Sequence, residues 1–114
     1  MHEYSIVAAL VDRVAREAGP RHAHVQRLAV TIGELAGVDV PLLQTAYDTF
    51  RAGTVCADAE LTIRQVAAEW RCPGCDTALA RGAPLRCATC GRPARLTAGD
   101  EIILERIEME VPDV

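Results

Sequence analysis

Four of the five cysteines in this chain form two C-x-x-C pairs. Cys72 and Cys75 enclose Pro-Gly, Cys87 and Cys90 enclose Ala-Thr, and eleven residues separate the two pairs. A C-x-x-C turn directs two thiolates to one side, so two such turns facing each other make a closed tetrahedral site of four sulfurs. The spacing therefore predicts one structural zinc ion bound by Cys72, Cys75, Cys87 and Cys90.

Other chemistries use similar cysteine patterns. Iron in a rubredoxin-like site would satisfy the same spacing, whereas a thioredoxin-like redox pair would use one C-x-x-C and leave the second unexplained. Because four protein thiolates fill the coordination sphere, no position remains for a bound water, and the zinc is expected to be structural and not catalytic. Cys56 lies outside the pattern and is expected to be a buried small apolar residue.

The chain is long enough for one compact core and a metal-stabilised lobe. It has 114 residues, half of them apolar. No apolar run approaches the ~20 residues that cross a bilayer, and a start of His2-Glu3 does not resemble a signal peptide. We therefore expect a cytoplasmic protein with reduced thiols and no membrane contact.

Apolar periodicity predicts an α+β fold. Helical spacing covers residues 3–18, which end at Gly19-Pro20, and residues 41–52, which follow a capping Asp39. Apolar residues alternate in the strand pattern over residues 25–34, 59–67 and 101–111. We expect a small three-stranded sheet with two helices, formed by residues 1–69 and 100–114, and a zinc-ribbon-like lobe, residues 70–99, inserted before the last strand.

Charge is unevenly distributed along the chain. The formal net charge is −4, every basic residue is arginine, and residues 70–99 hold five arginines against the single acid Asp76. A zinc-ribbon module that binds nucleic acid or a protein partner through this lobe is therefore an alternative interpretation. The acidic remainder of the chain argues against a nucleic-acid partner.

The first residues offer a second set of metal ligands. The amine of Met1, the backbone nitrogen of His2 and the His2 imidazole can close two small chelate rings, and such nitrogen-rich chelates favour nickel(II) or copper(II). A solvated histidine at a frayed end is the simpler explanation, and Glu3 also fits a first-turn carboxylate. His22 and His24 are expected to be exposed loop residues.

Several of these segments together resemble one known family. Met1-His2-Glu3-Tyr4-Ser5, the strand from Leu28 to Leu35, the two C-x-x-C pairs and Gly99-Asp100-Glu101 resemble, in this order, the HypA family of hydrogenase nickel-incorporation proteins. The resemblance implies a nickel metallochaperone whose nickel ligands come from Met1, His2 and Glu3. It also implies zinc at the four paired cysteines.

The resemblance also implies partners. Proteins of this family deliver nickel to the large subunit of [NiFe]-hydrogenase together with a HypB-type GTPase, and urease is a second possible client. The chain is expected to be a monomer or weak homodimer. No nucleophile–base pair, phosphate-binding loop or carboxylate dyad stands out in the sequence, so we do not expect an enzyme.

Overall fold

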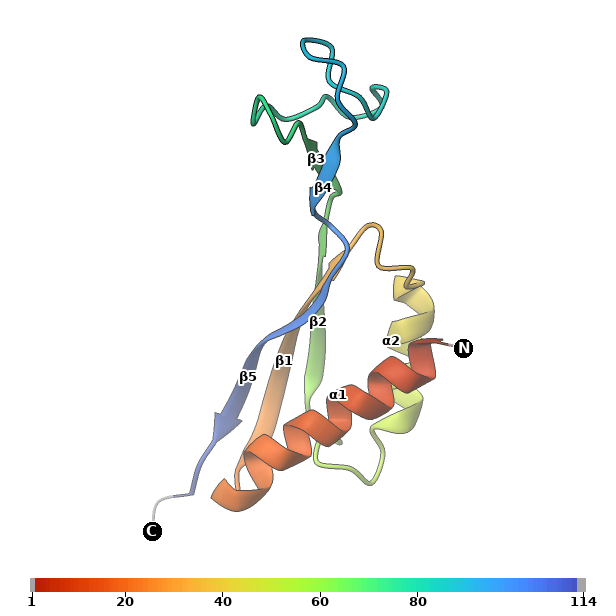
Figure 1. Cartoon of the computed structure of the whole chain (residues 1–114). Coiled ribbons are helices and arrows are strands. Elements are labelled where there is room, and N and C mark those ends of the chain that lie inside the picture. Colours follow the sequence, from red (N-terminus) through yellow and green to blue (C-terminus); the bar gives the residue numbers. More distant parts are fainter. Residues whose placement is uncertain (1, 113–114) are drawn as a thin grey trace.

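The computed structural model describes residues 2–112. The molecule is elongated and measures 61 × 31 × 16 Å, with a sheet and two helices at one end and the cysteine-containing segment at the other (Figure 1). The elements are α1 (His2–Ala18), the 3-10 turn η1 (Gly19–Arg21), β1 (His24–Gly33), α2 (Val40–Phe50), β2 (Glu60–Val66), β3 (Glu69–Arg71), β4 (Arg95–Ala98) and β5 (Ile102–Glu110). None of the helices in this range is long and apolar enough to cross a bilayer.

The three predicted strands form one sheet in the order β2-β1-β5. β1 pairs in parallel with β2 and antiparallel with β5, so the first strand of the chain is the central one. Leu28 faces Leu61 on one side and Ile107 on the other. The predicted α+β architecture of two helices and a small sheet is confirmed.

Both helices cover the same face of this sheet. Val7, Val11 and Val14 of α1 are buried, as helical spacing requires, and pack in one core with residues of β1 and α2. These are Leu28, Val30, Ile32, Leu43, Ala46 and Tyr47. The predicted cap is also present, because the Asp39 carboxylate accepts a hydrogen bond from the Leu42 amide at 3.0 Å.

Two short strands in the cysteine segment were not predicted. β3 and β4 pair antiparallel as a separate two-stranded sheet and extend away from the main sheet. With three and four residues, they are too short to show a periodic apolar pattern. We call residues 70–99 the cysteine lobe.

The main sheet and the β3–β4 pair meet at a narrow neck. Gly99 has φ +98°, and a Cβ atom there would lie 2.5 Å from the Ala68 Cα atom. A Cβ atom on Gly33 would lie only 2.2 Å from the carbonyl carbon of Gly99. Three backbone amides, those of Gly33, Glu34 and Leu35, donate to carbonyls of Glu101, Val66 and Gly99 respectively. Only glycine fits at position 99, because both its conformation and its surroundings exclude a side chain.

Replacing Gly99 with alanine should therefore be costly. We expect Gly99→Ala to lower the free energy of unfolding by roughly 2–4 kcal/mol, since backbone strain and a steric clash add. Gly53→Ala is the matched control, because Gly53 also has positive φ but open space around it, and it should cost only about 1 kcal/mol. Urea denaturation of both variants measures the difference, and equal losses would contradict this account of the neck.

Candidate metal centres

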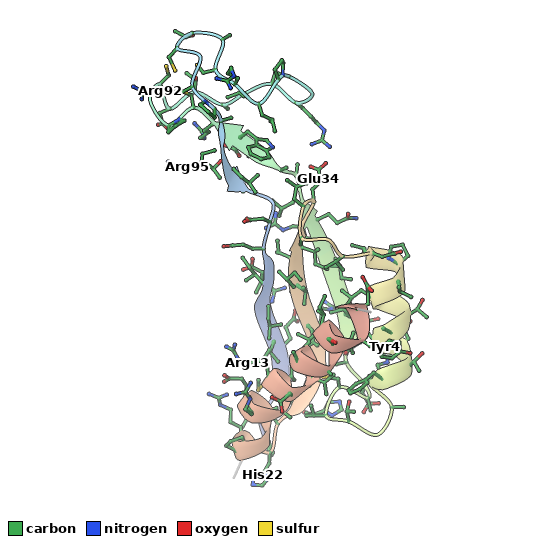
Figure 2. All side chains as sticks on the ribbon, turned by 45° about the vertical axis from the view of Figure 1, so that its right-hand side comes forward. Tyr4, Arg13, His22, Glu34, Arg92 and Arg95 are labelled. Atoms are coloured by element: carbon green, nitrogen blue, oxygen red, sulfur yellow. The ribbon has the colours of Figure 1, made fainter. Side chains whose placement is uncertain are left out.

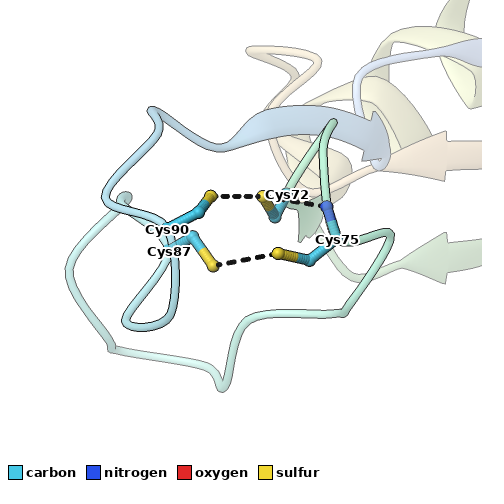
Figure 3. Close-up of side chains that lie close together, drawn as sticks. All are labelled: Cys72, Cys75, Cys87 and Cys90. Atoms are coloured by element: carbon cyan, nitrogen blue, oxygen red, sulfur yellow. Dashed lines mark hydrogen bonds between the residues drawn. The ribbon is translucent and has the colours of Figure 1, made fainter.

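The cysteine lobe brings the four predicted zinc ligands together. The Sγ atoms of Cys72, Cys75, Cys87 and Cys90 all lie within 4.8 Å of one another. Cys72 Sγ is 3.3 Å from Cys90 Sγ, and Cys87 Sγ is 4.0 Å from Cys75 Sγ (Figure 3). A tetrahedral zinc with Zn–S bonds of about 2.3 Å needs sulfur–sulfur distances of about 3.8 Å. The cluster therefore has the dimensions of a tetrathiolate metal site.

The two C-x-x-C turns have equivalent backbone hydrogen bonds. The Asp76 amide donates to the Cys72 carbonyl at 2.8 Å, and the Gly91 amide donates to the Cys87 carbonyl at 2.9 Å. In turn, the Cys72 amide donates to Thr77 and the Cys87 amide to Arg92. The residue after each second cysteine is left-handed, with φ +54° at Asp76 and +73° at Gly91. The turn thus reverses the chain at once, which directs both thiols inward.

The first cysteine of each turn is buried and accepts a backbone hydrogen bond that favours its thiolate form. Cys72 and Cys87 are buried, whereas Cys75 and Cys90 are exposed. A hydrogen bond from the Cys75 amide lowers the pKa of Cys72, and one from the Cys90 amide lowers the pKa of Cys87 to about 6. The neighbouring sulfurs, that of Cys90 most strongly, raise the pKa of Cys75 to about 12. Crowding four thiols in one place thus opposes their joint ionisation, which a divalent cation would reverse.

Arginines surround this cluster. The guanidinium of Arg92 lies against Gly74 inside the first turn, where a Cβ atom would be 2.5 Å from Nη1. Arg86 Nη1 donates to the Gly91 carbonyl in the second turn at 2.6 Å. These cations partly balance the negative charge that four thiolates leave on a divalent metal. Their contacts were not predicted, since the sequence shows only that arginines are frequent in the lobe.

The second predicted metal site lies at the start of α1. Met1 lies outside the described residues, and so does the side chain of His2, whose backbone begins the helix. The first turn of α1 lies beside α2, well away from the cysteine lobe (Figure 1). The described part of this site, the first turn of α1, therefore lies apart from the four cysteines (Figure 1).

Glu3 has a partner that the sequence did not indicate. Its side chain is buried, and Oε2 accepts a hydrogen bond at 3.1 Å from the backbone amide of Asp39, the residue that caps α2. The carboxylate thus joins the beginnings of both helices, in addition to its favourable place in the first turn of α1. This contact holds the backbone next to His2 at the start of α2.

The remaining candidate ligands are separate from these sites. His22 is an exposed residue in a left-handed turn, as expected, and His24 is exposed but begins β1. Cys56 is fully buried in the core, which confirms its interpretation as a small apolar residue. Its surroundings raise the pKa of this thiol, chiefly by burial.

Comparisons with known proteins agree with this arrangement of fold and cysteines. A family model described as "Hydrogenase/urease nickel incorporation, metallochaperone, hypA" matches residues 1–109. The hydrogenase maturation factor HypA of Wolinella succinogenes is 37% identical to this chain, and the match covers 99% of this chain and 98% of that protein. The HypA protein of Shewanella baltica is 34% identical, and the match covers 96% of this chain and 97% of that protein.

Two solved structures have the same fold. The solution structure of the Ni metallochaperone HypA from Helicobacter pylori aligns with a TM-score of 0.70 and 32% identity, covering 96% of this chain and 98% of that one. A second solution structure of a HypA protein aligns with a TM-score of 0.76 and 34% identity, and the alignment covers 96% of this chain and 97% of that one.

These matches define the class of protein as a nickel-incorporation metallochaperone and not an enzyme. The chain belongs to the HypA family. The resemblance noted from its motifs is thereby confirmed over nearly the whole length of the chain.

Metal retention should depend on the left-handed residue that ends the second turn. Gly91 has positive φ and open space around it, so Gly91→Ala should cost about 1 kcal/mol of backbone strain. Zinc affinity, measured by chelator competition, should fall roughly five-fold. Gly19→Ala, in open space outside the lobe, should leave it unchanged, and equal affinities for both variants would refute the turn geometry described above.

Proposed function

We propose that this chain carries nickel(II) for the maturation of [NiFe]-hydrogenase, with zinc as a structural ion in its cysteine lobe. The observation that carries the proposal is the family match, which extends from residue 1 to residue 109 and so includes both the Met-His-Glu start and the paired cysteines. Hydrogenase is the first client to test, and urease, which the family description also names, is the second.

The proposed zinc ligands are Cys72, Cys75, Cys87 and Cys90. Their sulfurs have tetrathiolate dimensions, and a closed site of this kind suits zinc, which has no redox chemistry of its own. The ion would order a lobe that has few large apolar side chains with which to form a core. On this basis we propose that residues 70–99 form one domain, and that residues 1–69 and 100–114 form the other.

The proposed nickel ligands are nitrogens of Met1, His2 and Glu3. The Met1 amine, the imidazole and backbone nitrogen of His2 and the Glu3 backbone nitrogen would form a nearly planar chelate, which selects nickel(II) by geometry. The buried Glu3 carboxylate, which accepts a hydrogen bond from the Asp39 amide, would hold one end of this chelate at the start of α2. The other donors would remain accessible, so that a partner can remove the ion.

The proposed partners are a HypB-type GTPase and the hydrogenase large subunit. Nucleic acid is not among them, because several lobe arginines are already engaged within the molecule. Arg81 pairs with Glu34, Arg71 pairs with Glu69, and Arg86 donates to the Gly91 carbonyl. The lobe therefore offers fewer free cations than its composition indicates, which weakens the alternative of a nucleic-acid-binding ribbon.

Nickel binding should require both His2 and a free amine at Met1. His2→Ala, or residues added before Met1, should abolish binding of nickel in calorimetric titrations of purified, untagged protein, because each change removes a chelate ring. His24→Ala is the control and should bind nickel normally, since His24 is exposed on β1. An unchanged affinity in His2→Ala would refute the proposed carrier site.

The same titrations should depend on pH. An imidazole must be neutral to bind a metal, so nickel affinity should fall as the pH drops below about 6.5, the ordinary histidine range.

Zinc content, measured by elemental analysis, should be one ion per chain in both His2→Ala and the parent protein. Protein that contains no zinc, or iron in its place, would contradict the structural ion proposed here.

A further inference from the structure

One ion pair joins the cysteine lobe to the main sheet. Glu34 follows the last residue of β1, and both of its carboxylate oxygens accept hydrogen bonds from Arg81, at 2.9 Å for Oε1. Oε1 also accepts from the Ala68 backbone amide at 2.8 Å. Residues 34 and 81 thus meet across the neck, and Figure 2 shows Glu34 pointing toward the lobe. Among the described residues, the other ion pair that crosses the boundary is Arg71–Glu69, whose two partners both lie in β3, so it does not tie the lobe to the main sheet.

Apolar packing does not fix the lobe at this point. A hollow of about 570 Å³ separates the loop that follows β1 from the lobe. Its walls include Leu35 on one side and Trp70, Leu79 and Leu85 on the other. Leu35 and Leu85 remain about half exposed, at 50% and 52%. A well-packed interface would bury such residues, so close contact here depends on the polar bridge.

The covalent connection across the neck is slender. Only β3 and β4 lead into the lobe, and their pairing shifts register between Glu69 and Trp70. An isolated two-stranded ribbon bends and twists more readily than a wider sheet. The backbone hydrogen bonds of Gly33, Glu34 and Leu35 reach no further than Gly99. Beyond that point, within residues 2–112, the ribbon is two-stranded, and only an isolated bridge between Arg71 and Ala78 lies beside β3.

We propose that the Glu34–Arg81 ion pair is a conformational lock that holds the cysteine lobe in one orientation relative to the main sheet. When the pair is broken, the junctions at residues 68–69 and 98–99 become a hinge. The lock involves neither the proposed nickel ligands nor the cysteines. It therefore goes beyond the proposed carrier function and does not depend on nickel.

The groups around the pair keep it charged over the ordinary pH range. Hydrogen bonds from Arg81 and from the Ala68 amide lower the pKa of Glu34 to about 2, and Glu34 in turn raises the pKa of Arg81. The other charged group beside the hollow, Glu69, pairs with Arg71. Because the pKa of Glu34 is depressed, the lock should be complete above the ordinary carboxylate range and lost only as pH falls toward 2.

The test compares the orientation of the two parts in solution. Residual dipolar couplings are measured on the full chain loaded with zinc and on its Arg81→Met variant, also loaded with zinc. This substitution removes the cation but keeps most of the side-chain length. In the parent protein, one alignment tensor should fit both the main sheet and the lobe. In Arg81→Met, the lobe couplings should shrink relative to those of the sheet, because the lobe samples several orientations. Glu34→Gln, which removes the charge, should have the same effect.

Arg95→Met is the matched control. It makes the same chemical change in the same lobe, but Arg95 has no ion pair within the described residues. It should leave all couplings unchanged. Unfolding is not expected in any of these variants, since 72% of the Arg81 side chain is exposed, and amide chemical shifts of the sheet check this directly.

Three results would overturn the lock. The first is an Arg81→Met protein in which a single tensor still fits both parts, because the ribbon alone would then fix the lobe. The second is a Glu34 carboxyl that titrates at its ordinary pKa in the parent protein, since an intact pair must hold that pKa near 2 and its loss in Arg81→Met must raise it toward 4.5. The third is an Arg95→Met protein whose lobe couplings shrink as much as those of Arg81→Met, because the effect would then come from the charge of the lobe in general and not from this ion pair.

Discussion

The close contact of three backbone segments at the neck determines the shape of this protein. Gly99 lies so close to Gly33 on one side and to Ala68 on the other that a Cβ atom on either glycine would clash with the neighbouring backbone. The chain can therefore leave the main sheet as a two-stranded ribbon and return beside its own exit. Everything beyond this point, including the four cysteines, lies outside the hydrophobic core. The lobe must therefore obtain its order from its own sulfur cluster and polar contacts.

Local patterns in the sequence predicted most of the fold. The apolar spacing of α1 and α2 and the Asp39 cap are short-range signals, and all three are present. β3 and β4 were not predicted because they have only three and four residues. Their positions are set by the neck and the cysteine turns, which require no alternation of apolar residues. The β2-β1-β5 order depends on long-range pairing, which periodicity does not encode.

The candidate sites were predictable to different degrees. Cysteine spacing alone identified the tetrathiolate cluster, since each turn is a local motif. The Glu3–Asp39 hydrogen bond and the Glu34–Arg81 ion pair join residues 36 and 47 positions apart. In the sequence, nothing distinguishes these residues from ordinary charged surface residues, so only the three-dimensional structure shows the two interactions.

The insertion of the lobe between β2 and β5 has a consequence for how the chain folds. β1, α2 and β2 follow one another along the chain, whereas β5 must reach β1 after the 35 residues that separate it from β2. Closing a loop of that length costs conformational entropy before any strand pairing compensates for it. A metal that joins Cys72 to Cys90 shortens the free chain and brings the ends of the excursion together. A cation far from the core would thus accelerate completion of the sheet as well as order its own ligands.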